Sequence, residues 1–106
     1  IRHVLKYNGE NENCAKLYQD LSKIIFTEKT SKKMNLSESM DNFVSQTENL
    51  IEEIKLPNKL RDVGVENPEK SLPFLASEAM KQTRLLPNNP REVAYDDALK
   101  LYKEAY

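Results

Sequence analysis

Apolar residues recur every three or four positions along most of this chain, the spacing that gathers them on one face of an α-helix. The longest regular series predicts the longest helix, between about residue 38 and Lys55. Its core-facing members are Met40, Phe43, Val44, Thr47, Leu50, Ile51 and Ile54. Ser37 stands where an N-cap residue is expected and Glu38 falls in the first turn. Pro57 lacks an amide donor, so the helix ends before it.

A second stripe predicts a helix that begins at Asn11 or Asn13 and buries one apolar face. The members of that face are Cys14, Leu17, Tyr18, Leu21, Ile24 and Ile25. Before it, residues 1–7 have the pattern of a helix end. Asn8 and Gly9 are expected to stop that helix, because glycine readily adopts a left-handed cap. The polar stretch from Thr27 to Lys33 has no periodicity and is interpreted as an exposed connection.

The second half of the chain is divided by prolines and by one glycine. Pro57 is predicted to open a short helical turn that runs through Arg61 and is closed by Gly64. The sequence Asn67-Pro68-Glu69 has the order of a cap, a first helical residue and an acidic second residue. A further helix is therefore predicted from about residue 68, with Pro73 early enough in it to be tolerated or else marking its true start.

The apolar face of that helix is predicted to contain Phe74, Leu75, Ala79 and either Leu85 or Leu86. Pro87 and Pro90 then require an ordered turn rather than more helix. A last helix opens at Ala94 or Tyr95, with two aspartates in the first turn, where the helix dipole favours them. Its buried side is expected to hold Ala98, Leu99, Leu101, Tyr102 and Ala105.

These elements predict an all-α bundle of five or six helices without strands. A chain of 106 residues with 39% hydrophobic and 31% charged residues has enough core for one such domain, residues 1–106. It is short for an enzyme that must hold both a nucleotide and a second substrate, which usually takes more than about 150 residues.

Charge and composition exclude several classes of partner. The net charge of −1 gives no overall field for nucleic acid or an anionic membrane, and the short apolar runs exclude a membrane span. The single cysteine, Cys14, cannot form an internal disulfide and is interpreted as a small buried hydrophobe rather than a reactive thiol, which suits a cytoplasmic setting. The start at Ile1 is expected to mark a part of a larger protein.

Residues with catalytic or metal-binding chemistry are scarce. Gly9 and Gly64 are the only glycines, so no glycine-rich phosphate loop exists, and His3 is the only histidine. The adjacent carboxylates Glu52-Glu53 and Asp96-Asp97 diverge on their helices and suit no shared proton transfer. We predict no catalytic, cofactor-binding or metal-binding residue. One polar cluster surrounds the proline turn and consists of Lys81, Gln82, Thr83, Arg84, Asn88, Asn89 and Arg91. Residue type alone favours a structural role for it.

Several short segments, in this order along the chain, resemble the C-terminal end of the iron-containing alcohol dehydrogenases. They are His3-Val-Leu-Lys-Tyr-Asn8, Leu60-Arg-Asp-Val-Gly-Val65, Leu72-Pro-Phe-Leu-Ala76, Asn89-Pro-Arg91 and Asp96-Asp-Ala-Leu-Lys-Leu-Tyr102. The resemblance extends over nearly the whole chain, and it is nearest to the branch that holds lactaldehyde reductase and butanol dehydrogenases.

The resemblance implies that this chain is the distal part of a helical domain. In that family an α/β domain binds NAD(P), the helical domain holds Fe(II) through an aspartate and three histidines, and substrate binds between them. The ligands precede the segment that His3 matches, and His3 is not one of them. Thr83 and Arg84 match pocket-side positions and are the candidate substrate-pocket residues. The parent is expected to be a homodimer that exchanges hydride between a primary alcohol or aldehyde and NAD(P). This chain, without the preceding N-terminal part, is expected to be inactive.

Two other hypotheses stay open. The chain could be a stand-alone helical module whose groove binds a partner helix, or a structural or regulatory remnant of the enzyme fold. The coding sequence before Ile1 discriminates among them. A glycine-rich segment followed by an aspartate and spaced histidines would favour the enzyme, whereas a nearby start codon would favour the module.

Overall fold

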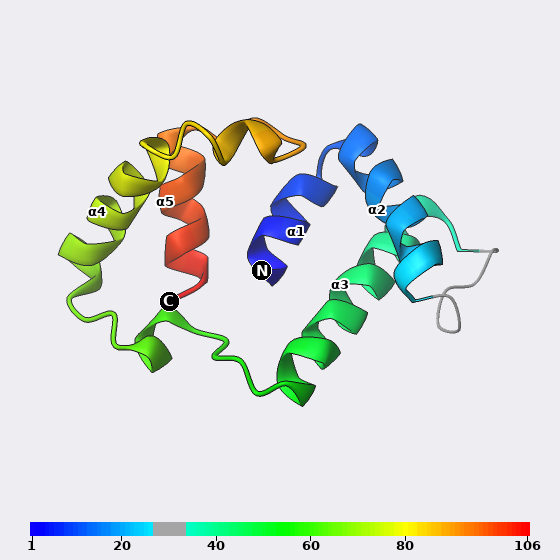
Figure 1. Ribbon diagram of the computed structural model, residues 1–106, viewed down its shortest axis with the longest axis horizontal. Helices are drawn as coiled ribbons and strands as arrows, with labels where there is room; N and C mark the ends of the chain where they lie inside the picture. Colours follow the sequence, from blue (N-terminus) through cyan, green and yellow to red (C-terminus); the bar gives the residue numbers. More distant parts are fainter. Residues whose placement is uncertain (27–33) are drawn as a thin grey trace. The chain divides into compact units, whose positions relative to one another are not determined.

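The structure is a computed structural model that describes residues 1–26 and 34–106. The connection predicted for Thr27 to Lys33 therefore lies outside the described residues. The described elements are helices, as predicted (Figure 1): α1 (Arg2–Gly9), α2 (Glu12–Ile25), α3 (Leu36–Glu53), η1 (Leu60–Val63), α4 (Pro68–Met80), η2 (Leu86–Asn88) and α5 (Tyr95–Glu104). η1 and η2 are short 3₁₀-helices. The chain divides into two compact units, Ile1–Lys55 and Leu56–Tyr106, and each is described by itself.

The first helix continues through Gly9 instead of stopping before it. Gly9 is the last residue of α1, and Gly64 is the only glycine with a positive φ. A Cβ atom on Gly9 would lie 2.5 Å from Cε of Met40, closer than such atoms approach one another in proteins. The prediction of a left-handed glycine cap was therefore wrong. Glycine instead allows α1 to approach the Met40 side chain of α3 closely.

The second helix begins after Asn11, one of the two predicted starts, but it buries only part of its predicted apolar face. The Asn11 side chain accepts hydrogen bonds from the backbone N–H groups of Asn13 and Cys14, which makes it the N-cap. Cys14 is buried, as predicted. Leu17, Leu21, Ile24 and Ile25 are exposed, so the prediction that they face the core was wrong. Ala15 and Ser22 are buried instead, so the covered face of α2 includes positions outside the predicted stripe.

The third helix is capped by Asn35 rather than by Ser37. The Asn35 side chain accepts from the Glu38 N–H at 2.9 Å, and the Glu38 carboxylate accepts from the Asn35 N–H at 2.9 Å. This reciprocal capping box places Ser37 inside the first turn. Met40, Phe43, Val44 and Ile51 of the predicted face are buried. Leu50 and Ile54 of that face are exposed, contrary to the prediction.

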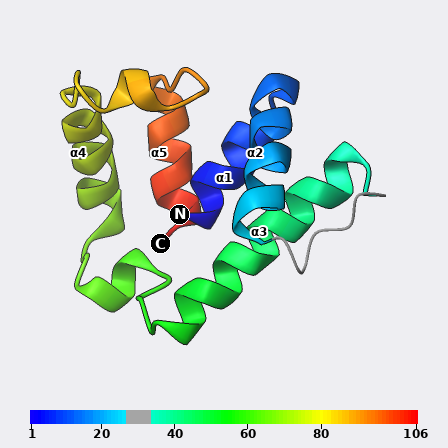
Figure 2. The ribbon, with the colours of Figure 1, turned by 45° about the vertical axis from the view of Figure 1, so that its right-hand side comes forward.

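The core of the first unit lies where its three helices meet (Figure 2). Ala15, Met40 and Val44 form a buried cluster against which Leu5, Tyr18 and Leu36 pack. The Tyr18 ring stacks on Phe43 with centroids 5.4 Å apart, and its hydroxyl accepts a 2.8 Å hydrogen bond from the buried Asn8 amide. The Gln19 amide donates to the Ser39 hydroxyl at 3.0 Å. These two polar links join α1 to α2 and α2 to α3, and thus fix which faces meet.

The second unit opens with a helical turn that is joined to the end of α5. That turn, η1, starts at Leu60, so the prediction that Pro57 opens it was wrong, whereas Gly64 closes it as predicted with a φ of 85°. The Leu60 N–H donates to the Ala105 carbonyl at 2.9 Å. The Arg61 guanidinium lies 4.9 Å from the centroid of the Tyr106 ring and donates to the Tyr106 carbonyl. The turn is thereby held to the end of the last helix.

Helices α4 and α5 lie side by side and form the body of the second unit (Figures 1 and 2). α4 begins at Pro68 as predicted, although Asn67 caps it without a side-chain hydrogen bond. The buried residues of α4 are Leu72 and Ala76, while Phe74 is 62% exposed, contrary to the prediction. Ala98 is the buried residue of α5. Small side chains on both helices favour their close approach.

Candidate functional site

The proline turn after α4 is ordered, as predicted, and its asparagine side chains hold the backbone. Residues Leu86–Asn88 form the η2 turn of 3₁₀-helix. The Asn88 amide donates to the Arg84 carbonyl at 3.0 Å, and the Asn89 amide donates to the Arg91 carbonyl. After the turn, the Asp97 carboxylate accepts from the Ala94 N–H at 3.0 Å and starts α5 at Tyr95. Side-chain hydrogen bonds therefore hold the backbone of this segment at Arg84 and at Arg91.

Thr83 and Arg84, the two predicted pocket residues, lie at the start of this segment and are both exposed. The Thr83 N–H donates to the Lys81 carbonyl at 2.9 Å, so hydrogen bonds fix the backbone on both sides of the pair. Lys81 forms an ion pair with Glu78. A hydroxyl next to a guanidinium can donate hydrogen bonds to a carboxylate, a phosphate or the oxygen of a small polar ligand.

The unit that carries Thr83 and Arg84 also exposes large apolar side chains. Leu85, the next residue along the chain, is 64% exposed, and Phe74 of α4 is 62% exposed. Single exposed apolar residues are common on proteins, but here one of them follows directly on the two candidate polar residues. The segment thus offers both polar and apolar side chains, the two kinds that line small-molecule pockets.

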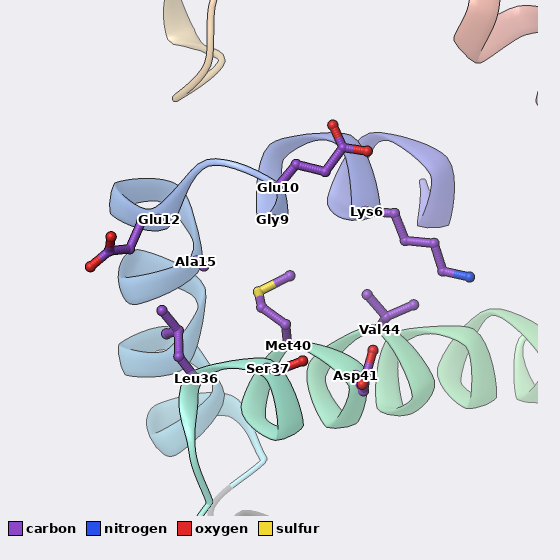
Figure 3. Close-up of a pocket in the computed structure, with 10 residues that line it drawn as sticks. All are labelled: Lys6, Gly9, Glu10, Glu12, Ala15, Leu36, Ser37, Met40, Asp41 and Val44. Atoms are coloured by element: carbon purple, nitrogen blue, oxygen red, sulfur yellow. The ribbon is translucent and has the colours of Figure 1, made fainter.

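The first unit contains a groove of about 570 Å³ between α1, α2 and α3 (Figure 3). Met40 and Val44 point from α3 into the space below Gly9, and Ala15 and Leu36 complete its apolar wall. Its other lining residues are polar or charged: Lys6, Glu10, Glu12, Ser37 and Asp41. In Figure 3 the Glu12 side chain points away from the apolar floor, so the groove has apolar walls and a charged edge.

One carboxyl at this edge has a shifted pKa. Glu12 forms an ion pair of 2.6 Å with Lys16, and the hydrogen bond from Lys16, together with its positive charge, lowers the pKa of Glu12 below its usual value. The pair therefore contributes most above the ordinary pKa of a glutamate, and the contribution is lost as the pH falls through the lowered pKa. Glu12 is ionised at neutral pH and is no proton donor there.

The described residues do not form a metal centre. Within residues 1–26 and 34–106 no three His, Cys, Asp or Glu side chains are placed to hold one ion. His3 is half-buried on α1 and accepts a hydrogen bond of 3.2 Å from the Arg2 side chain. These residues do not fit the iron site that the family resemblance implies. In the same ranges no helix is long and apolar enough to cross a membrane.

The sequence did not predict the groove. Its walls come from three helices, and the pattern along one chain does not say how helices are placed against each other. The only local signal was Gly9, a glycine inside a helical pattern, which often marks a close approach of two backbones or side chains. Thr83 and Arg84 were found by resemblance, and the structure leaves both side chains exposed.

Comparisons with known proteins identify the chain's family. It is 29% identical over 106 residues to lactaldehyde reductase of Escherichia coli K12, and 29% identical over 106 residues to lactaldehyde reductase of Escherichia coli O157:H7. Each match covers 100% of this chain and 26% of the relative, so the chain spans about a quarter of the length of these relatives. The profile described as "Fe-containing alcohol dehydrogenase family, C-terminal" matches residues 1–106. Because this match extends over the whole chain, the protein belongs to the Fe-containing alcohol dehydrogenase family and corresponds to its C-terminal region.

Proposed function

We propose that this chain is the C-terminal helical part of an NAD(P)-linked alcohol dehydrogenase that interconverts a primary alcohol and its aldehyde. In this proposal the iron and the coenzyme are held by polypeptide outside these 106 residues, and the intact enzyme is a homodimer. The observation that carries the proposal is the family match over residues 1–106. The relatives named lactaldehyde reductase favour a short hydroxyaldehyde as the substrate.

The role proposed for this chain is to form one wall of the substrate pocket. Thr83 and Arg84 are exposed on a segment whose backbone is fixed by hydrogen bonds at both ends. A pre-ordered segment binds a ligand at a lower entropic cost than a mobile one. The hydroxyl of Thr83 and the guanidinium of Arg84 would orient the oxygens of a hydroxyaldehyde, and the apolar Leu85 would exclude water beside them.

A chimera tests this function. The matched quarter of Escherichia coli lactaldehyde reductase would be replaced by residues 1–106 of this protein, and aldehyde-dependent oxidation of NADH and of NADPH would be measured after loading with Fe(II). We expect activity from the chimera, and none from this chain alone or from the relative without its matched quarter. A chimera that folds and binds iron but reduces no aldehyde would contradict the proposal. Activity of the isolated chain would contradict the proposal that the metal and coenzyme sites lie outside these 106 residues.

A substitution at Arg84 tests the pocket role separately. In the active chimera, Arg84→Ala is expected to raise KM for lactaldehyde by roughly tenfold to a hundredfold, since one charge-assisted hydrogen bond contributes about 1.5–3 kcal/mol and each 1.4 kcal/mol is about a factor of ten. The matched control is Lys81→Ala, three residues earlier, whose ammonium is paired with Glu78 and which is expected to leave KM unchanged. Equal KM values for the two variants would show that Arg84 does not contribute to substrate binding.

A further inference from the structure

Met40 of α3 belongs both to the core of the first unit and to the wall of the groove between α1, α2 and α3. Its side chain is 8% exposed and forms a buried cluster with Ala15 and Val44. The same side chain lines the groove, whose volume is about 570 Å³, and Figure 3 shows it extending from α3 toward Gly9. A solute of about the size of water that enters the groove therefore meets the Met40 thioether while the protein stays folded.

The Met40 thioether has no free space on the side of α1. A Cβ atom on Gly9 would lie 2.5 Å from Cε and 3.5 Å from Sδ of Met40. The end of the Met40 side chain thus occupies the space that any larger residue in place of Gly9 would need. In a close-packed contact of this kind, one added atom displaces the neighbouring element. The chemical state of Met40 therefore affects directly how closely α1 approaches α3.

We propose that Met40 is an oxidation site at which hydrogen peroxide, entering through the groove, converts the thioether to a sulfoxide and loosens α1 from α3. A lone pair on Sδ attacks one oxygen of the peroxide, the S–O bond forms and the O–O bond breaks. The proton on the transferred oxygen passes to the departing hydroxide, which leaves as water. The sulfur loses two electrons and the peroxide gains them, so the reaction needs neither iron nor a coenzyme.

The sulfoxide is poorly accommodated where the thioether fits. Its polar oxygen stands beside the apolar residues of the groove, Ala15, Leu36 and Val44, and a polar group in such surroundings loses hydrogen bonds to water. The enlarged group cannot retreat toward Gly9, because that side is already filled. Both effects act where α1 and α3 meet. Methionine sulfoxide reductases reverse the oxidation, which makes the contact a reversible redox switch.

The other two methionines provide internal controls. Met34 precedes α3 and Met80 ends α4, and both are half-buried. Neither lines the groove or belongs to the buried cluster of the first unit. Because they are more exposed than Met40, they are expected to react with peroxide at least as fast, but without loosening α1 from α3.

Two matched variants separate Met40 from these controls. Met34→Leu combined with Met80→Leu leaves Met40 as the only methionine, and Met40→Leu removes Met40 alone. Leucine has a similar volume and resists oxidation. Each folded variant is treated with hydrogen peroxide, and the added oxygen is located by peptide mass spectrometry. Thermal unfolding and hydrogen exchange of the α1 amides are measured before and after treatment, so each variant is its own reference whatever its starting stability.

The double variant is expected to gain one oxygen at Met40, to unfold at least about 4 °C lower and to exchange its α1 amides faster after treatment. The treated Met40→Leu variant should carry oxygen on Met34 and Met80 and keep its unfolding temperature. Since Gly9 closes one side of the thioether, one sulfoxide epimer should predominate, and the reductase specific for it should restore the protein. A chain oxidised in urea should instead need both reductases.

Three results would refute the oxidation site. One is a Met40 that takes up oxygen only in urea, which would mean that the groove does not admit peroxide. Another is an oxidised Met40 with unchanged exchange in α1, which would mean that the contact tolerates the sulfoxide. The third is an equal loss of stability in Met40→Leu, which would assign the effect to Met34 or Met80.

Discussion

Replacement of Phe43 by alanine is expected to lower the free energy of unfolding by about 3–5 kcal/mol. The Phe43 ring is 7% exposed and contacts two other rings, with centroids 5.4 Å from Tyr18 and 5.7 Å from Phe26. Removing it leaves a cavity between α2 and α3 and breaks both aromatic contacts. A small domain is stable by only about 5–15 kcal/mol, so the loss is a large share of the total. Urea denaturation followed by far-ultraviolet circular dichroism measures it.

Leu50→Ala is the matched control for this prediction. Leu50 lies on the same helix and belongs to the same predicted apolar face, but it is 46% exposed. Full burial of a leucine contributes about 1.5–3 kcal/mol, so a half-exposed one should lose no more than about 1 kcal/mol when truncated. A cost for Leu50→Ala as large as that for Phe43→Ala would mean that this face of α3 is covered in solution.

The helices themselves could be predicted from the sequence because apolar periodicity is a local property. The all-α class, the series from Met40 to Ile51 and the start of α4 at Pro68 all follow from spacing and cap residues. Which part of a helix surface another helix covers is not a local property of the sequence. On α2 the pattern predicts burial of Leu17, and the structure buries Ser22 instead. Periodicity identifies the residues that share a face, but only tertiary packing decides how much of that face is covered.

The errors at helix ends have a similar origin. Asn35 and Ser37 are both good N-cap residues, and the sequence alone made Ser37 the more obvious one because the apolar series starts three residues later. The reciprocal bonds between Asn35 and Glu38 select the earlier position, and the spacing of a capping box was already visible in the sequence. At Gly9 no local signal would have sufficed, since the reason for glycine is the Met40 side chain of another helix.

The candidate site was less accessible to sequence reasoning than the fold. Thr83 and Arg84 came from the family resemblance, because their residue types and spacing fit an ordinary helix end as well as a pocket. The groove beside Gly9 was missed, since it exists only where three helices meet. Local chemistry could predict the asparagine bonds of the proline turn, such as the one from Asn88 to Arg84, because both partners lie within four residues.

Ala76→Leu is expected to destabilise the second unit by about 1–3 kcal/mol, although leucine is more hydrophobic and nearly as good a helix former. Ala76 is 0% exposed on α4, which packs against α5. The three added carbon atoms have no free space, so α4 and α5 must separate or adopt strained rotamers. Thermal unfolding measures the loss, and amide chemical shifts of α5, which is not mutated, report the displacement of the helices.

The neighbouring position provides the control, because it separates packing from helix propensity. Ser77 is exposed on the same helix, so Ser77→Leu should change the free energy of unfolding by no more than about 0.5 kcal/mol and leave the α5 shifts in place. If packing governs the stability of the second unit, Ala76→Leu and Ser77→Leu change the free energy of unfolding by different amounts or in opposite directions, although the two positions are adjacent. If both substitutions are neutral, α4 and α5 are not held together at Ala76.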